Sequence, residues 1–122
     1  MPIVDVELVC ESEVEFGTVS PRAIADAVGS VFRSPPGHTW VRLRFVNSKH
    51  YAENNLSVSG AELPVFVTVV HARPPVAAAL AAEVAALTTT VAQIIGRPAE
   101  RVHVQYAPPA IGRQAFGGQL VK

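Results

Sequence analysis

Pro2 is the first candidate for a catalytic residue. Removal of Met1 would leave Pro2 with a secondary amine at the start of the chain. An α-amino group has a pKa of about 8 in an unstructured chain, and burial beside a cation lowers that pKa towards neutrality. Such an amine is a suitable base for removing a proton next to a carbonyl. The hypothesis requires the loss of Met1, because a retained Met1 would turn the Pro2 nitrogen into an amide without basicity.

Three arginines are candidates for binding the carboxylate of a substrate. Arg42 and Arg44 are two positions apart in an alternating run, so they share one face of a predicted strand, and Arg73 follows a later strand. A guanidinium binds a carboxylate through two parallel hydrogen bonds. A solvated strand face or an ion pair between subunits would explain the same arginines, and both interpretations stay open.

Other polar and aromatic candidates are weaker. Tyr106 could polarise a substrate oxygen, although a tyrosine in a final strand is more often part of the core, and His103 and Trp40 are weaker still. The four histidines lack the spacing of metal ligands, and the chain has no phosphate loop or dinucleotide fingerprint, so we predict no metal and no cofactor. Cys10 is expected to be a buried strand residue rather than a nucleophile.

Composition narrows the class of protein. The 122 residues are 49% hydrophobic and 16% charged, and ten basic residues balance ten acidic ones. This composition excludes a disordered chain, argues against nucleic acid as a partner and favours oligomerisation. The single cysteine fits a reducing compartment, and no secretory signal is visible. Uninterrupted apolar runs such as 76–82 are too short to span a bilayer, so we expect a cytoplasmic protein without a membrane partner.

The elements that must position these residues form two strand–helix–strand units. Period-two alternation, helical spacing and capping residues define each element. In chain order they are a strand over 3–10, a helix from Ser20-Pro21 to the stop at 34–37, a strand over 40–45, a strand over 65–70, a helix opened by Arg73-Pro74-Pro75 and closed by Gly96, and a strand over 102–106.

The two units repeat at a regular offset. Pro2 and Pro64 are 62 positions apart, and Phe45 and Tyr106 are 61 apart. Each unit should pair parallel strands through a right-handed crossover. We therefore predict an α/β fold of the two-layer α+β kind, with a four-stranded sheet and two helices on one face. The uncovered sheet face is expected to be buried in a homotrimer. The predicted organisation is a single domain over 1–122, with units at about 2–46 and 64–106, a linker at 47–63 and a tail at 107–122.

This arrangement resembles the tautomerase superfamily over essentially the whole chain. That family includes 4-oxalocrotonate tautomerase, 5-carboxymethyl-2-hydroxymuconate isomerase, malonate semialdehyde decarboxylase, the 3-chloroacrylate dehalogenases and macrophage migration inhibitory factor. The residues that carry the resemblance are Pro2, Val41-Arg42-Leu43, the strand and turn from Val65 to Pro74, the turn from Gly96 to Val102, and Phe116-Gly117-Gly118.

The resemblance implies a keto–enol tautomerase, an isomerase that shifts a proton in a small unsaturated 2-oxo or 2-hydroxy carboxylate, in the degradation of aromatic compounds. Pro2 would act as acid and base. Arg73 and Arg42, in preference to Arg44, would hold the carboxylate, and Phe116 would belong to a C-terminal hairpin that walls the pocket.

Two departures from the family pattern bear on the alternatives. Arg73-Pro74-Pro75 stands where decarboxylase-like members carry two arginines, and the aspartate that they place before the second strand falls near His38. Both differences count against decarboxylation and dehalogenation. A Pro2-dependent hydratase, dehalogenase or decarboxylase of a small three-carbon acid stays open as an alternative enzyme. A binding protein that has kept the fold without the activity is the alternative from another class.

Overall fold

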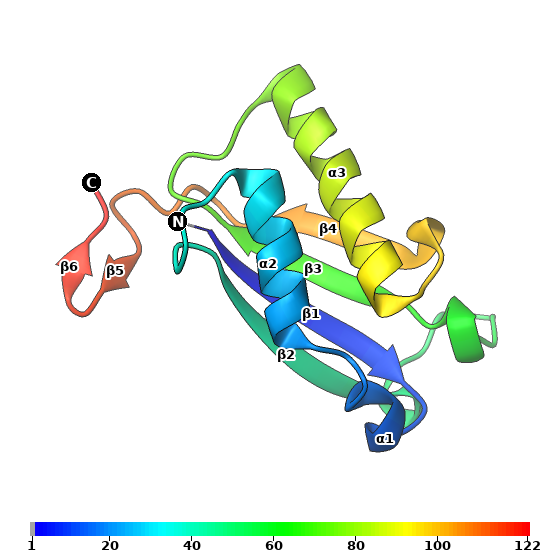
Figure 1. Cartoon of the computed structure of the whole chain (residues 1–122). Coiled ribbons are helices and arrows are strands. Elements are labelled where there is room, and N and C mark those ends of the chain that lie inside the picture. Colours follow the sequence, from blue (N-terminus) through cyan, green and yellow to red (C-terminus); the bar gives the residue numbers. More distant parts are fainter. Residues whose placement is uncertain (1) are drawn as a thin grey trace.

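Four strands form one sheet in the computed structural model, which describes residues 2–122 (Figure 1). The strands are β1 (Ile3–Cys10), β2 (Trp40–Asn47), β3 (Val65–Val70) and β4 (Val102–Tyr106). Their order is β2-β1-β3-β4. The outer pairs β1–β2 and β3–β4 are parallel, and the central pair β1–β3 is antiparallel. The predicted fold class is confirmed.

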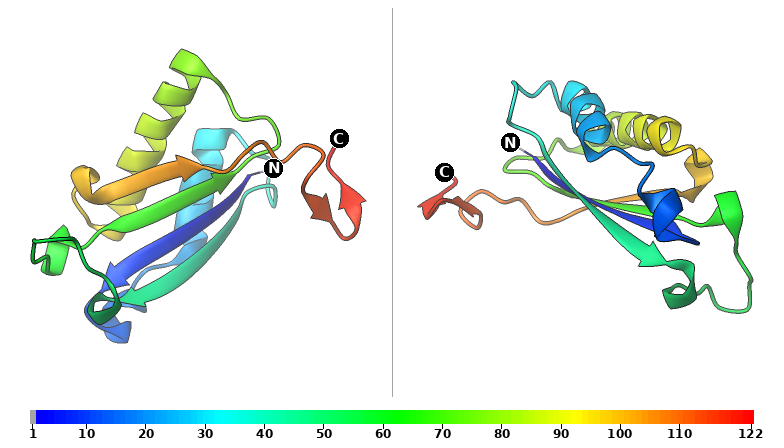
Figure 2. Two further views of the ribbon diagram at one scale, coloured as in Figure 1. Left: turned by 180° about the vertical axis from the view of Figure 1, so that it is seen from behind. Right: turned by 60° about the horizontal axis from the view of Figure 1, so that its bottom comes forward.

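Two helices cover one face of this sheet, and no helix lies over the opposite face in the part of the chain described (Figure 2). α2 (Pro21–Phe32) begins at the predicted cap, where the Ser20 side chain accepts the N–H of Ala23 at 3.1 Å. α3 (Ala77–Ile95) ends at Gly96, whose φ of 77° lies in the left-handed region that glycine adopts without strain.

The core lies between the sheet and these helices. Alternate side chains of the two central strands point into it and are fully buried, for example Val4 and Val67. From the helices, Ile24, Leu87 and Val91 pack against them. Full burial of each such side chain contributes roughly 1.5–3 kcal/mol, so this layer fixes the position of β1 and therefore of its first residues.

Corresponding residues of the two units are 61 positions apart. The alternating buried residues of β1 have even numbers, and those of β3 have odd numbers. Val4 pairs with Val41, and Val65 pairs with Val102, so both strands of the second unit follow at the same odd offset.

The expected equivalence of Pro2 and Pro64 is therefore wrong by one residue. A shift of one position in a strand moves every side chain to the other face, so the buried pattern decides the alignment rather than the matching prolines. Leu63, which is 1% exposed, is the counterpart of Pro2 in the second unit.

The connecting segments contain short elements that the sequence patterns did not reveal. α1 (Glu13–Phe16) is capped by Ser12, and the linker holds two 3-10 turns, Ser48–His50 and Gly60–Glu62. The guanidinium of Arg101 fastens this linker to β4 by bonding to the Glu53 carboxylate and the Glu62 carbonyl. β5 (Ala115–Phe116) and β6 (Gln119–Leu120) form a hairpin that stands away from the main sheet (Figure 1).

α3 is long and apolar enough to cross a membrane by length and composition alone, with 19 residues and a mean hydropathy of 1.6. The expectation from uninterrupted apolar runs overlooked it, because Glu83 and Thr88 divide its sequence. A mostly buried core helix meets the same criteria, but here 17% of the window is buried, with Leu87, Val91 and Ala92 facing the sheet, and a single such helix carries little weight. α3 is therefore weak evidence for a membrane.

Candidate active site

The first residues of β1 and β2 meet at one corner of the sheet. Ile3 pairs with Trp40, and the backbone N–H of Trp40 donates to the carbonyl of Pro2 at 3.1 Å. Parallel strands begin at the same edge of a sheet, so the residues just before β2 lie beside Pro2. Pro2 itself is buried.

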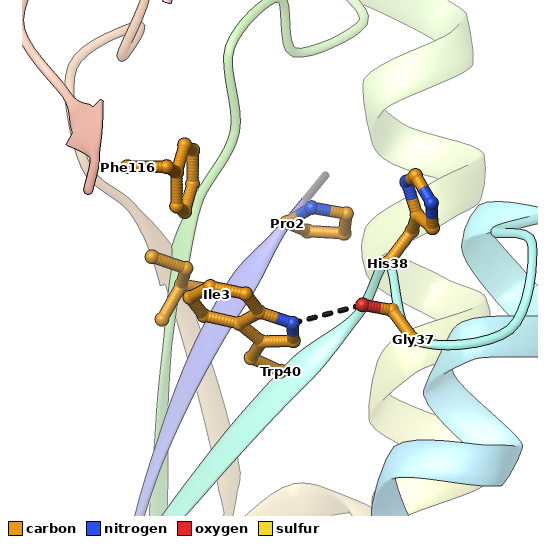
Figure 3. Close-up of a pocket in the computed structure, with 6 residues that line it drawn as sticks. All are labelled: Pro2, Ile3, Gly37, His38, Trp40 and Phe116. Atoms are coloured by element: carbon orange, nitrogen blue, oxygen red, sulfur yellow. Dashed lines mark hydrogen bonds between the residues drawn. The ribbon is translucent and has the colours of Figure 1, made fainter. Parts of the chain in front are cut away.

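A cavity of about 410 Å³ opens at this corner (Figure 3). Its lining residues come from the start of β1, the segment that leads into β2 and the C-terminal hairpin: Pro2, Ile3, Gly37, His38, Trp40 and Phe116. Most of these side chains are apolar, and the volume is within the range of small-molecule sites. The corner can therefore enclose a small, partly apolar organic molecule next to Pro2.

The segment before β2 is held in a fixed turn. The N–H of His38 donates to the Pro35 carbonyl at 3.1 Å, and the Trp40 indole N–H donates to the Gly37 carbonyl at 2.9 Å (Figure 3). Gly37 has a φ of 79°, which a residue with a side chain rarely adopts. These contacts fix both His38 and the indole ring that forms part of the cavity wall.

The C-terminal hairpin supplies the opposite wall, as the resemblance implied for Phe116. Gly117 and Gly118 both have positive φ and make its tight turn. The Phe116 ring meets the Trp40 ring edge to face, with centroids 5.2 Å apart and planes at 89°. The tail that carries the hairpin is tied to β3 by the N–H of Ala107, which donates to the Val69 carbonyl at 2.9 Å.

The candidate arginines lie elsewhere. Arg42 is on the open face of the sheet, where Nε and Nη2 donate to the Asp5 carboxylate at 2.6 and 2.9 Å, and this partner raises the pKa of Arg42. Arg44 lies beside Glu7 in the register of β1 and β2. Arg73 is exposed in the segment after β3. Within the described residues no arginine lines the cavity, and carboxylate binding by these three stays a prediction.

Tyr106 faces the helices. Its hydroxyl donates to a carboxylate oxygen of Glu83 on α3, and burial, together with this carboxylate, raises the pKa of Tyr106. This position matches the core interpretation of the residue. The cavity lining does not include Tyr106, and its role towards a substrate also stays a prediction.

His71 follows β3 at the same corner. The register pairs Ile3 with Val70, so the residues next to this pair are Pro2 and His71. Its Nδ1 accepts the backbone N–H of Arg73 at 3.1 Å, so the neutral ring carries its proton on Nε2. Burial lowers the pKa of His71, which favours that neutral form.

The sequence predicted Pro2 and Phe116 as residues of this site but did not predict three of the residues that line the cavity. Ile3 and Gly37 were not considered, and His38 was considered only as a metal ligand and as a departure from the family pattern. The predicted parallel pairing of the first two strands already indicated Gly37 and His38, because it places the residues before the second strand beside the first residues of the chain. Across residues 2–122 no group of three or more His, Cys, Asp or Glu is arranged to hold a metal ion.

Several solved structures that share this fold are members of the tautomerase superfamily. Pt0534 inactivated by 2-oxo-3-pentynoate has a TM-score of 0.76 and 18% identity, covering 98% of this chain and 94% of that one. A wild-type fused 4-OT described as an asymmetric trimer has a TM-score of 0.75 and 16% identity, with 97% and 94% covered. Macrophage migration inhibitory factor from Oncomelania hupensis has a TM-score of 0.73 and 17% identity, with 100% and 83% covered.

No protein-family model and no curated protein matches the sequence itself. The likeness is therefore one of fold, and at that level the resemblance to the tautomerase superfamily is confirmed.

Proposed function

We propose that this chain is a tautomerase that shifts a proton in a small unsaturated 2-oxo or 2-hydroxy carboxylate, with the nitrogen of Pro2 as the base. The observation that carries the proposal is the place of Pro2, buried at the start of a central strand and in the wall of an apolar cavity of about 410 Å³. Met1, whose removal the proposal requires, lies outside the described residues.

The environment of Pro2 suits an amine that must be partly neutral at cellular pH. Apolar walls disfavour the charged ammonium, and this desolvation lowers the pKa of a buried amine. The neutral amine takes a proton from the substrate, and the ammonium that results can return a proton in the same turnover. Because the sheet fixes the first residues of β1, the nitrogen is held in place during both transfers.

A cation is needed to hold the carboxylate and to stabilise the dienolate as charge develops. We assign this role to Arg73 first and to Arg42 second. Arg73 follows β3, whose end lies at the same sheet edge as Pro2, whereas Arg42 is already engaged by Asp5. The fused 4-OT structure described as a trimer, together with the sheet face that no helix covers, supports assembly of this chain as a homotrimer.

Ketonisation of 2-hydroxymuconate or phenylenolpyruvate tests the proposal. The wild type, confirmed by intact mass to lack Met1, should be active with an ascending pH limb set by the Pro2 amine. Pro2→Ala keeps a primary amine in the same place and should retain a small fraction of the rate. Insertion of one alanine before Pro2 converts the nitrogen into an amide and should abolish the rate.

A chemical probe gives an independent result. 2-Oxo-3-pentynoate, which inactivated Pt0534, should inactivate this chain and leave its adduct on the peptide that begins with Pro2. Equal rates from the wild type and the alanine-insertion variant would show that Pro2 is not the base. Inactivity of the correctly processed chain on both enols would contradict the tautomerase proposal.

A further inference from the structure

We propose that His38 is a second acid–base residue of the cavity, which donates a proton to the substrate carbon while Pro2 accepts the proton that leaves. This inference rests on the proposed function and assigns the two halves of the proton transfer to different groups.

The lining of the cavity points to His38. Its six residues are a proline, an isoleucine, a glycine, a histidine, a tryptophan and a phenylalanine, so His38 has the one side chain in this lining that can both donate and accept a proton. Figure 3 shows the His38 ring beside Pro2, with Phe116 on the other side of the proline. A substrate in contact with Pro2 therefore lies within the same small cavity as the imidazole.

The position of His38 also suits a proton donor, which must regain its proton after each turnover. The backbone of the residue is fixed by its bond to the Pro35 carbonyl, which limits the entropy lost when the ring meets a substrate. The residue is exposed to solvent, so the ring can exchange its proton with water between turnovers.

Few other ionisable groups surround this corner. His71 follows β3 beside Pro2, and burial lowers its pKa, which favours the neutral ring. Arg22, Asp26 and Arg33 line a neighbouring hollow that shares Gly37 with the cavity. Arg22 pairs with Asp26 at 3.3 Å, so Arg33, which follows α2, adds a positive charge on that side.

The step balances without an oxidant or a cofactor. The Pro2 nitrogen takes the proton of the enol hydroxyl, and the O–H electron pair forms the carbonyl. The electrons of the carbon–carbon double bond take a proton from the His38 imidazolium. The ammonium of Pro2 and the neutral ring of His38 then exchange one proton through water, which restores both groups and leaves the keto acid as the product.

Two variants of His38 and one matched control test this assignment. His38→Gln and His38→Ala should lower kcat for phenylenolpyruvate by about tenfold to a thousandfold, in the range that general acid–base groups contribute, with a smaller change in KM. The descending limb of the pH profile of kcat, which requires the imidazolium, should disappear. His50→Gln should behave as wild type, because His50 follows β2 at the opposite end of the sheet.

Chemical rescue separates proton donation from a structural role. Added imidazole should restore part of the rate of His38→Ala and none of the rate of the alanine-insertion variant. A raised KM with unchanged kcat and no rescue would make His38 a carboxylate ligand and overturn the inference. Unchanged kinetics in both His38 variants, with an active wild type, would overturn the inference and leave the proposed function standing. Inactivity of the wild type would overturn both.

Discussion

Arg97 is the most deeply buried charged side chain in the described structure, with 4% of its side chain exposed, and its removal should destabilise the protein strongly. Its guanidinium donates to the carbonyl of Leu63, to the carbonyl of Val9 at 3.0 Å and to the carboxylate of Glu15 at 3.1 Å. These partners belong to the segment just before β3, the end of β1, and α1. One side chain therefore joins three segments that are distant in sequence.

The cost of Arg97→Ala follows from these contacts. The change leaves two carbonyls without this donor, and each buried acceptor without a partner costs roughly 1–3 kcal/mol. The ion pair with Glu15 adds little, because that carboxylate is 48% exposed and solvent screens it. We expect a total of about 3–5 kcal/mol, as for other disrupted buried charge networks. For a chain of 122 residues this lowers Tm by about 12–20 °C, since each kcal/mol is worth ~4 °C at this size.

Thermal unfolding followed by circular dichroism or calorimetry measures this difference. Arg22→Ala is the matched control, because Arg22 pairs with Asp26 within one helix and the two side chains are 87% and 67% exposed. Its Tm should stay within about 2 °C of the wild type, as for other exposed ion pairs. A drop of less than about 4 °C for Arg97→Ala would refute the reasoning, because it would mean that the two carbonyls find other donors.

Three further predictions concern other parts of the molecule. Cys10 is fully buried, and burial raises the pKa of its thiol, so the reactive thiolate forms only at higher pH. Mass spectrometry should therefore show slow alkylation of Cys10 by iodoacetamide at pH 8 in the native protein and fast alkylation in urea. Equal rates would contradict this burial. Arg73→Ala should lower kcat/KM by roughly tenfold, the effect of losing one charge-assisted contact, and wild-type kinetics would remove Arg73 from the site. Light scattering should give three times the chain mass of 12.9 kDa, and a monomer at micromolar concentration would contradict the homotrimer.

Most of the fold could be predicted because local signals agreed with one another. The alternation in β1 and the cap at Ser20-Pro21 each have a direct physical cause, and both are present in the structure as expected. α1 could not be predicted, because a helix of four residues is too short to show a period. The 61-residue offset of Phe45 and Tyr106 agrees with the strand register, whereas the match of Pro2 with Pro64 was one residue off, because the prolines matched in sequence while the buried faces did not.

The candidate site was predictable only in part, because its geometry depends on register. Pro2 and Phe116 were expected to meet, and they line the same cavity. The partner of Arg42 could not be read from the sequence, since Asp5 lies 37 positions away and becomes its neighbour only through the pairing of β1 with β2. The position of His38 in the site could have been predicted, because the predicted parallel pairing already placed His38 near the first residues of the chain.

The two units have equivalent sheet corners, but only one of them can carry an amine. The corner of the second unit contains Leu63, which is joined to its neighbours by peptide bonds on both sides and whose carbonyl is held by Arg97. The proposed base therefore occurs once in the chain, although the strand–helix–strand unit occurs twice. Titration with 2-oxo-3-pentynoate should reach its end point at one equivalent per chain. The second corner is instead held together by a buried guanidinium, which joins Leu63 to β1 and α1.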